Sequence, residues 1–301
     1  MSSETVVDAG LLRGMKLPAH EEGGDKDVRG SVLAIGGSRR VPGAIMLSAV
    51  AALRAGAGRL GIGTCQTTAV QLGLAIPESM VMGLPETEGG DIAPEAAALL
   101  MERASRSDAI LIGPGMTDRK TGCQLTAALL AELEGPAFVL DAGAMRGILE
   151  HRDVMRRHAG RVVITPHAGE MASLLDMSRD DVLADPLAAA RRAASQLQVV
   201  VAMKGRCTRI VTPEGRAWAS SQGNVGLATS GSGDVLAGII AGLMARGAPP
   251  LHATVWGVFT HGEAGRRLAL EVGPVGYLAR ELLDGIPTIL ADLGGQMEPS
   301  S

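Results

Sequence analysis

The sequence has few aromatic residues. Two tryptophans, one tyrosine and two phenylalanines stand among 301 residues, so the interior must be built from alanine, leucine, valine, isoleucine and methionine. Hydrophobic residues make up 46% and charged residues 20% of the chain, which is ordinary for a globular protein with a sizeable core. Glycine is abundant, with 41 residues, and beside the many alanines it indicates tight turns and closely packed helices.

Features of several other protein classes are missing. The formal net charge is −4 and no long basic run occurs, so a nucleic-acid partner is not favoured. Cys65, Cys123 and Cys207 form no CxxC pair, which suits a reducing compartment without disulfides. Residues 1–30 lack the apolar core of a signal peptide, and no apolar run reaches the ~18 residues of a membrane helix. We therefore expect a soluble cytoplasmic protein that does not bind membranes.

Short β-branched runs alternate with longer segments rich in alanine and leucine. This alternation predicts βαβ units, a mostly parallel sheet and helices on both of its faces. The strand runs are almost entirely apolar, as expected for parallel strands that are buried on both faces. The predicted strands are 32–35, 59–62, 79–82, 109–112, 137–140, 162–164 and 199–203, and the predicted helices are 43–57, 94–104, 118–132, 144–150, 169–175 and 180–196.

The pattern changes after Lys204. Residues 208–219 predict a hairpin around the turn Pro213-Glu214-Gly215. Helices are then expected at 234–246, 251–270 and 276–283. Since no linker rich in proline, serine or charge interrupts the chain, we predict one domain over residues 29–295, preceded by a loosely ordered segment, residues 1–28.

Small, charged or reactive residues follow five of the predicted strands. In open parallel sheets, ligands bind outside the carboxyl ends of the strands. One glycine there would mean little, because glycine also closes strand-to-helix turns for steric reasons. Five such ends together predict a ligand-binding face. They are Gly36-Gly37-Ser38, Gly113-Pro114-Gly115, Asp141, Thr165-Pro166-His167 and Lys204-Gly205.

The segment Gly231-Ser232-Gly233-Asp234 opens a predicted helix. Glycine lets a ligand approach the backbone, and a helix N-terminus offers unpaired N–H groups to phosphate oxygens. Asp234 could accept a proton from a substrate hydroxyl as that hydroxyl attacks phosphorus. The alternative is that Ser232 or Asp234 only caps the helix. The segment alone leaves both interpretations open.

Lys204-Gly205-Arg206-Cys207-Thr208 leaves a buried strand and enters the hairpin. Its two cations could offset phosphate charge, while an ordinary turn with solvated cations is the alternative. The chain contains no GxxxxGK[ST] sequence, so this is not a Walker P-loop. The GxGxxG spacing is also missing after residues 32–35, which disfavours a Rossmann dehydrogenase.

Thr165-Pro166-His167-Ala168-Gly169-Glu170 places a histidine just before a helix. His167 could hydrogen-bond a substrate and Glu170 could reach a metal-bound water, or both could cap the helix. The remaining histidines share no metal-ligand spacing. We expect His151 and His158 at the surface and His261 as a core or interface group.

In this order, the segments resemble the ADP- or ATP-dependent NAD(P)H-hydrate dehydratases. The resemblance runs from about Gly30 to Leu290, and its most specific parts are TPHAGE at 165–170 and GNVGLATSGSGD at 223–234. It implies a ribokinase-like fold with three α/β/α layers. It also implies a repair reaction, in which ADP or ATP drives removal of the water added at C6 of hydrated NADH or NADPH. The hydroxyl is phosphorylated and leaves as phosphate, which is a better leaving group than hydroxide.

The resemblance also assigns roles to matching residues. Asp234 corresponds to the base, and the backbone N–H groups of Gly231, Ser232 and Gly233 to the anion hole. Mg²⁺ is implied with the nucleotide phosphates, although no carboxylate cluster identifies its ligands. The implied contacts to the hydrated cofactor are Ala44, Gly115, His167 and Asp234, and those to the nucleotide are Lys204, Gly205, Arg206, Cys207, Thr208, Asn224 and Gly233.

The chain departs from the family pattern at two positions. Gly143 stands where an aspartate is common, and Ser230 where glycine is common. Many relatives carry a fused epimerase domain, and since only about thirty residues precede the first predicted strand, we expect a separate epimerase to act upstream. The resemblance also suggests a homo-oligomer, with a tetramer as one form.

Two other functions compete with this interpretation. A small-molecule kinase of the same superfamily, of the hydroxyethylthiazole or hydroxymethylpyrimidine type, would share the turn and Asp234, but TPHAGE and the loop at 204–208 argue against it. A non-catalytic nucleotide sensor would keep the fold while losing turnover, and Gly143 and Ser230 keep that alternative open.

Overall fold

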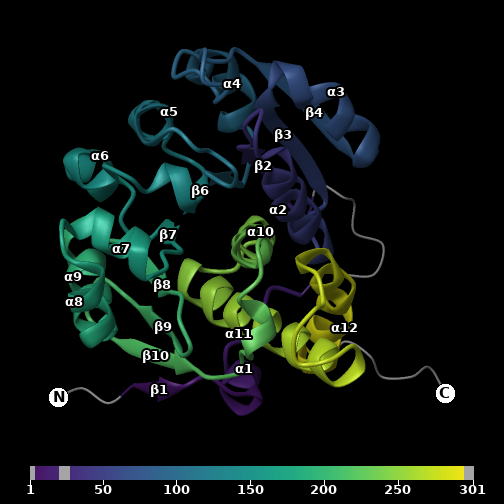
Figure 1. Cartoon of the computed structure of the whole chain (residues 1–301), viewed down its shortest axis with the longest axis vertical. Helices are drawn as coiled ribbons and strands as arrows, with labels where there is room; N and C mark the ends of the chain where they lie inside the picture. The colour runs from purple at the N-terminus through teal and green to yellow at the C-terminus, as the bar shows by residue number, and fades with distance from the viewer. Residues whose placement is uncertain (1–3, 20–27, 295–301) are drawn as a thin grey trace.

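The structure, a computed structural model, describes residues 4–19 and 28–294 (Figure 1). Its strands form one sheet in the order β1-β10-β9-β8-β7-β6-β5-β2-β3-β4. Neighbouring strands are parallel except at β9, which runs antiparallel to β10, as the predicted hairpin requires, and also to β8. The strands are β1 Thr5–Val6, β2 Ser31–Ile35, β3 Arg59–Cys65, β4 Ser79–Leu84, β5 Ala109–Ile112, β6 Ala137–Leu140, β7 Val162–Ile164, β8 Val200–Met203, β9 Thr208–Val211 and β10 Ala217–Ser220.

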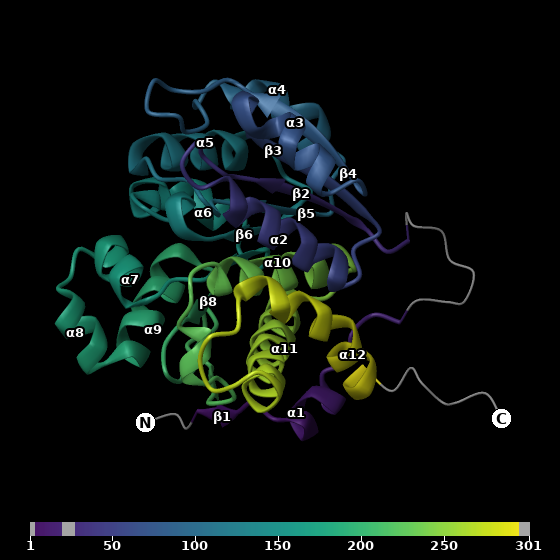
Figure 2. The ribbon, with the colours of Figure 1, turned by 45° about the vertical axis from the view of Figure 1, so that its right-hand side comes forward.

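Helices cover both faces of the sheet, which gives the predicted α/β/α layers (Figure 2). The covering helices are α2 Pro42–Arg54, α3 Gln66–Ala75, α10 Ser232–Ala245, α11 Pro250–Glu271, α12 Leu282–Gly294 and α1 Ala9–Gly14 on one side, and α4 Ala96–Ser105, α5 Arg119–Glu132, α6 Arg152–Arg157, α7 Ala168–Leu175, α8 Arg179–Ala184 and α9 Pro186–Leu197 on the other.

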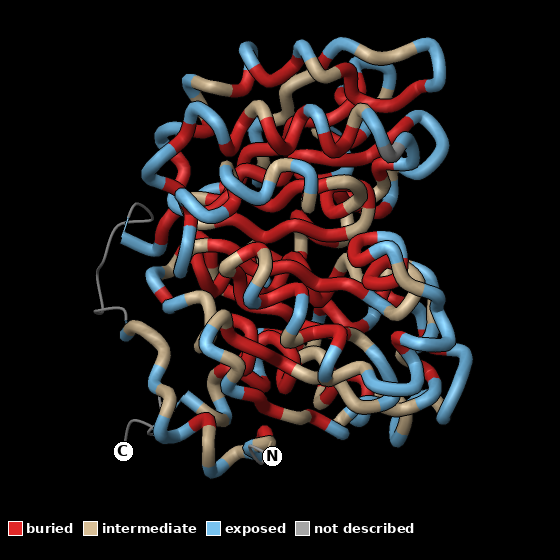
Figure 3. The backbone as a smooth tube through the Cα atoms, turned by 90° about the vertical axis from the view of Figure 1, so that its left-hand side faces the viewer, coloured by how far each residue is buried: buried red, intermediate tan, exposed pale blue. Residues whose placement is uncertain are grey.

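The alternation of strand side chains explains the apolar runs. Val32 and Ala34 join the core under α2 and α10, whereas Leu33 and Ile35 join the core under α4 and α5. Every residue of β5 and β8 is buried, so the centre of the molecule forms a continuous buried layer (Figure 3). Both faces of these strands must therefore be hydrophobic.

Helix α10 packs unusually close to α2. A Cβ atom built on Gly238 would lie 2.1 Å from the Ser48 carbonyl oxygen, and one on Gly242 would lie 2.4 Å from that of Ala52. Only glycine fits at these two positions. The predicted use of glycine for close helix packing is confirmed here.

Three helix boundaries differ from prediction. The predicted helix 180–196 divides into α8 and α9, because Asp185 caps α9 ahead of Pro186 and its carboxylate accepts the Ala188 N–H (2.9 Å). The segment predicted as helix 144–150 forms 3₁₀ turns at Ala142–Ala144 and Ile148–His151. Between them Gly147 adopts a φ of +83°, which interrupts a helix. The last predicted helix begins with a 3₁₀ turn, Ala279–Glu281, and continues as α12.

The N-terminal segment is better anchored than predicted. Strand β1 pairs with β10, and Leu12 of α1 is fully buried. The indole Nε1 of Trp256 donates to the Met15 carbonyl oxygen (2.6 Å). The expectation of a loosely ordered segment over 1–28 is therefore wrong for residues 4–19, because a strand edge and an apolar helix face hold them. Residues 1–3 and 20–27 lie outside the described part of the chain.

The expected surface position of His158 is also wrong. Its side chain is buried, its Nε2 lies 2.7 Å from the Leu130 carbonyl oxygen, and its ring meets Phe138 edge-on. Burial lowers its pKa.

Within the described residues, no helix is both long and apolar enough to cross a bilayer.

Candidate functional site

The chain reverses direction across the sheet between β2 and β5. From β2 it passes outward through β3 and β4, and then returns to β5 on the other side of β2. Loops that leave two such strands diverge and open a crevice, which is where open α/β sheets bind ligands. The Gly37 N–H donates to the Pro114 carbonyl oxygen (2.7 Å) at this point. The two glycine-rich loops predicted as part of a binding face therefore lie side by side.

Ala44 and Gly115 meet at the same crevice. A Cβ atom on Gly115 would lie 3.1 Å from the Ala44 Cβ and 2.5 Å from the Val41 carbonyl oxygen, and its φ is +75°. Leu47, three residues further along α2, lies next to the segment that opens α10, because its Cδ1 would be 2.5 Å from a Cβ built on Gly231. The two predicted substrate contacts therefore lie together, Ala44 on α2 and Gly115 in the loop after β5, and α2 itself packs against the turn that opens α10.

The turn before α10 is built around Gly231. This residue is the N-cap of α10 and adopts a φ of +90°, where a side chain would be strained. No side chain caps this helix, so the alternative in which Ser232 or Asp234 acts only as a cap is wrong. The Ser232 N–H donates to the Thr229 carbonyl oxygen (3.3 Å) and is thus engaged within its own turn. The N–H of Gly233, in the first helical turn, has no acceptor inside the helix and suits an anion.

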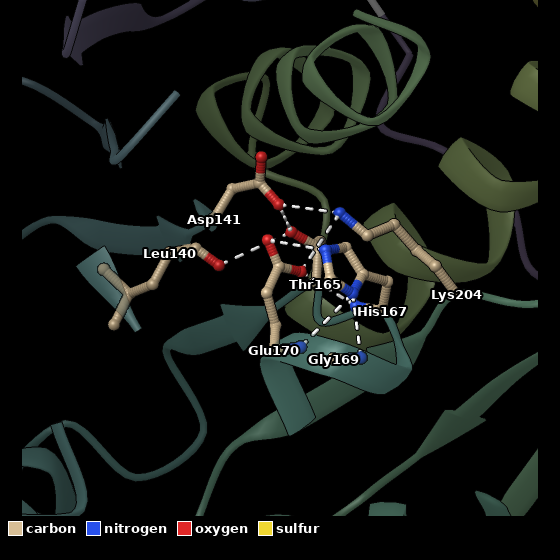
Figure 4. Close-up of polar contacts among 7 residues, drawn as sticks. All are labelled: Leu140, Asp141, Thr165, His167, Gly169, Glu170 and Lys204. Carbon is tan, nitrogen blue, oxygen red and sulfur yellow. Dashed lines mark hydrogen bonds and ion pairs between the residues drawn. The ribbon is translucent and has the colours of Figure 1, made fainter. Parts of the chain in front are cut away.

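Three side chains at strand ends, Asp141, Thr165 and Lys204, form a polar cluster with Glu170 of α7 (Figure 4). The Lys204 Nζ donates to Asp141 Oδ1 (3.0 Å) and lies 3.8 Å from Glu170 Oε2. Thr165 Oγ1 donates to the same Asp141 oxygen (2.6 Å). Burial acts to lower the pKa of Lys204, but the carboxylates of Asp141 and Glu170 outweigh it and raise that pKa. Lys204 therefore stays charged and fixed beside the turn.

Asp234 lies in the first turn of α10, next to this cluster. Burial and the charge of Asp141 raise its pKa to about 7, and the charge of Lys204 opposes them. A carboxylate with this pKa is a stronger base than an ordinary aspartate and can be deprotonated near neutral pH. The position predicted for the base therefore has the electrostatic environment of one.

His167 and Glu170 form a reciprocal cap on α7. The His167 Nδ1 accepts the N–H groups of Gly169 (3.0 Å) and Glu170 (3.2 Å), while Glu170 Oε2 accepts the His167 N–H (2.8 Å). The capping alternative is confirmed for both residues. Because Nδ1 accepts, the neutral ring carries its proton on Nε2, and the side chain is 57% exposed. That Nε2 lies 3.4 Å from Glu170 Oε1, so a ligand that reaches the exposed ring would meet it beside this carboxylate.

A cavity of about 920 Å³ lies beside the turn and the polar cluster. Apolar side chains of Val225, Leu227, Leu236 and Val258 form one part of its wall. Most of the predicted nucleotide contacts line it, whereas Cys207 does not. The predicted residues in the wall are His167, Lys204, Gly205, Arg206, Thr208, Asn224, Ser232 and Gly233.

Asn224 is held in place by its carbonyl oxygen. This Oδ1 accepts the Gly226 N–H (2.8 Å) and the Tyr277 hydroxyl (2.7 Å). Its amide Nδ2 is buried on the cavity wall without a partner in the described part of the chain. A buried donor without a partner costs free energy, and this atom is not itself exposed to the cavity.

The structure also explains the two departures from the family pattern. A Cβ atom on Gly143 would lie 2.6 Å from the Met116 Cβ and 2.8 Å from the Met116 carbonyl oxygen, so aspartate does not fit there in this chain. Among the described non-glycine residues, those with positive φ are Ala142, Asp176 and Gln198. Ser230 is not one of them and is therefore not strained.

Two members of the site were missed or misjudged from the sequence. Asp141 stands out as a strand end, but its bond to Lys204 depends on strand order. His261 was expected in the core or an interface, and instead it lines the cavity, with its Nε2 2.9 Å from Ser232 Oγ. Sequence spacing offers no signal for this pair, because two packed helices bring the residues together.

Comparison with known proteins decides the family. The pattern described as NAD(P)H-hydrate dehydratase matches residues 32–288. This chain belongs to the NAD(P)H-hydrate dehydratase family. It is 46% identical over 288 residues to the ADP-dependent (S)-NAD(P)H-hydrate dehydratase of Xanthomonas campestris, covering 94% of this chain and 95% of that one.

Two further family members place the chain more closely. The bifunctional NAD(P)H-hydrate repair enzyme Nnr of Moorella thermoacetica is 39% identical over 94% of this chain, which spans 53% of that longer protein. The ADP/ATP-dependent NAD(P)H-hydrate dehydratase of Bacillus subtilis, co-crystallised with ATP and Mg²⁺, superimposes with a TM-score of 0.80 at 27% identity, covering 97% of this chain and all of that one. Ribokinase from Thermotoga maritima matches with a TM-score of 0.53 at 17% identity, and the shared fold is ribokinase-like as predicted.

Proposed function

We propose that this chain dehydrates the S-epimer of hydrated NADH or NADPH, using ADP or ATP and releasing AMP or ADP with phosphate. The observation that carries the proposal is Asp234, a carboxylate with a pKa of about 7 in the first turn of α10, next to Ser232 and Gly233, which line the cavity. The names of its relatives in Xanthomonas campestris and Bacillus subtilis support the same activity. The enzyme is thus a hydro-lyase that repairs nicotinamide cofactors.

In this mechanism Asp234 acts on the C6 hydroxyl of the hydrated ring. It accepts the hydroxyl proton while the oxygen forms a bond to the terminal phosphorus and the phosphorus–oxygen bond to the rest of the nucleotide breaks. The C6–oxygen bond then breaks with help from the ring nitrogen lone pair. Loss of a proton from C5 completes the double bond, and phosphate departs.

The remaining residues bind and position the two substrates. The Gly233 N–H and the Lys204 ammonium would both bind the phosphoryl group, and the two residues lie together, since a Cβ on Gly233 would be 3.1 Å from Lys204 Nζ. Ala44 and Gly115 contact the hydrated cofactor in the crevice, and the His167 imidazole contacts it from the wall of the cavity. The loop Lys204-Gly205-Arg206-Cys207-Thr208, Asn224 and the apolar cavity wall hold the nucleotide.

Mg²⁺ would come with the nucleotide. No group of three metal-ligating side chains occurs within residues 4–19 and 28–294. The carboxylate of Asp141 is already bound to Lys204 and Thr165, which leaves it poorly suited to an ion. Mg²⁺ readily keeps water and phosphate ligands, so the ion would shield phosphate charge without a dedicated protein site.

Other features stay predictions as part of this proposal. They are a single domain over residues 29–295, a cytoplasmic location, a homo-oligomeric state and an epimerase on a separate chain that supplies the S-epimer. Size-exclusion chromatography with light scattering would measure the assembly.

A direct assay tests the activity. The protein is incubated with hydrated NADH or NADPH and with ADP or ATP, and the absorbance of the reduced nicotinamide ring is followed. Recovery that depends on nucleotide is the expected result. No recovery with either nucleotide, together with phosphorylation of a thiazole or pyrimidine alcohol, would indicate the kinase alternative, and nucleotide binding without any turnover would indicate a sensor.

A further inference from the structure

A serine–histidine pair joins α10 to α11 at the wall of the cavity. Ser232 Oγ and His261 Nε2 lie 2.9 Å apart, and Ser232 is 3% exposed. Both residues line the cavity together with Lys204 and Gly233. The pair therefore faces the point where the ammonium of Lys204 and the first turn of α10 meet.

The hydroxyl is the donor that Ser232 can offer to a ligand. Its backbone N–H is already bound to the Thr229 carbonyl oxygen (3.3 Å). A hydroxyl is one donor and two acceptors, and its proton rotates to suit its neighbours. When a neighbouring N–H occupies an oxygen lone pair, the hydroxyl proton is free to point toward an anion.

His261 can supply that neighbouring N–H as a neutral ring. The pKa of His261 is lowered to about 4, mainly by burial and also by the charge of Lys204, while a hydrogen bond to the Ser232 backbone acts in the opposite direction. Neutral imidazole has one N–H and one lone pair, so its Nε2–H can donate to Ser232 Oγ. The imidazole then fixes the hydroxyl without adding a second positive charge beside Lys204.

We propose that His261 is a positioning residue for the terminal phosphate of the bound nucleotide, which it serves by holding the Ser232 hydroxyl with its proton directed into the cavity. The inference rests on the nucleotide site proposed above and adds a donor to it. His158 provides a contrast. That ring is also buried, but its Nε2 meets a backbone carbonyl oxygen and its edge meets Phe138, away from the cavity wall.

Calorimetric titration with ADP and with AMP, both with Mg²⁺, tests the proposal on the intact protein. Ser232→Ala and His261→Ala are each expected to weaken ADP binding about tenfold to a hundredfold, the usual effect of losing one hydrogen bond to a charged group. AMP lacks the terminal phosphate, so its affinity should change much less. The double variant should bind ADP no more weakly than either single variant, because both changes remove the same donor.

Two controls separate positioning from folding. His261→Gln keeps an N–H at the end of the side chain, and we expect it to retain ADP affinity within a few-fold of the wild type. His158→Asn should lower the melting temperature and leave ADP affinity unchanged. If His261→Ala does not fold, His261→Gln is compared with Ser232→Ala instead. Should His261→Gln weaken ADP binding as much as Ser232→Ala does, the proposal is overturned.

The remaining outcomes are also decisive. Unchanged ADP affinity in His261→Ala, or losses that multiply in the double variant, would show that the imidazole does not act through Ser232. Equal weakening of ADP and AMP would point to a general packing role and overturn the proposal. Normal ADP coupling without dehydration would reject the proposed reaction and leave this inference standing, whereas a wild type that binds neither ADP nor ATP would overturn both.

Discussion

Replacing Asp234 with asparagine separates the chemistry of this residue from its cost to stability. The folded protein holds the Asp234 proton with a pKa of about 7, against the ordinary value of 3.8. A group with a raised carboxyl pKa contributes stability below the unfolded value and loses it as the pH rises through the folded value. The wild type should therefore lose up to about 4 kcal/mol of unfolding free energy from this group between pH ~4 and ~7.

The amide side chain of the Asp234→Asn variant cannot ionise, so that loss should vanish. At pH ~8 the variant should be more stable than the wild type by up to about 4 kcal/mol, or about 6 °C in melting temperature for a chain of this length. Thermal unfolding of both proteins from pH ~4 to ~9 measures the difference. Asp284→Asn is the matched control, because Asp284 is 79% exposed in a surface ion pair with Arg54.

The same variant should lose turnover by about 10²- to 10⁴-fold, the usual contribution of a general base, while still binding ADP. A stability difference that does not change with pH would refute the buried, proton-holding environment of Asp234. Intact turnover would show that another group is the base.

Three other changes follow from the geometry. The acid limb of the kcat/KM profile should lie near pH ~7 in the wild type, where Asp234 deprotonates. Asp141→Asn should move this limb to lower pH, since the charge of Asp141 raises the pKa of Asp234. A limb that stays in place in the variant would contradict this electrostatic coupling. Gly143→Asp should lower the free energy of unfolding in urea by about 1–3 kcal/mol, because its Cβ would meet Met116 at 2.6 Å, and an undiminished value would show that the loop yields. Gly238→Ala should lower the melting temperature through its 2.1 Å approach to the Ser48 carbonyl oxygen, whereas Gly43→Ala, with no atom within 4 Å of its Cβ, should leave it equal or slightly higher.

Local pattern predicted most of the sheet. The strands from β2 to β8 and the hairpin of β9 and β10 lie where short apolar runs placed them, because a strand buried on both faces requires such runs. Helix α3 was missed: its sequence, QTTAVQLGLA, contains two threonines and a glycine and buries only Ala69 and Leu72. The division between α8 and α9 shows that one proline outweighs an otherwise continuous helical pattern.

The site was predicted in outline and changed in its details. His167 was expected to contact a ligand or cap a helix, and the structure shows the cap. The Ser232 N–H was expected in the anion hole, but it binds Thr229 within the turn. Such bonds depend on backbone geometry over a few residues, which residue types alone do not specify.

Residue types at the ends of strands were enough to predict a ligand-binding face, since glycine, lysine and aspartate follow strands whose carboxyl ends meet at one edge of the sheet. Only the tertiary structure decided which of them interact. The order β8-β7-β6 brings Lys204 to Asp141, 63 residues away along the chain. The charge of Asp141 in turn raises the pKa of Asp234. The packing of α11 on α10 brings His261 to Ser232. Such pairs depend on distances in space, and a sequence records only distances along the chain.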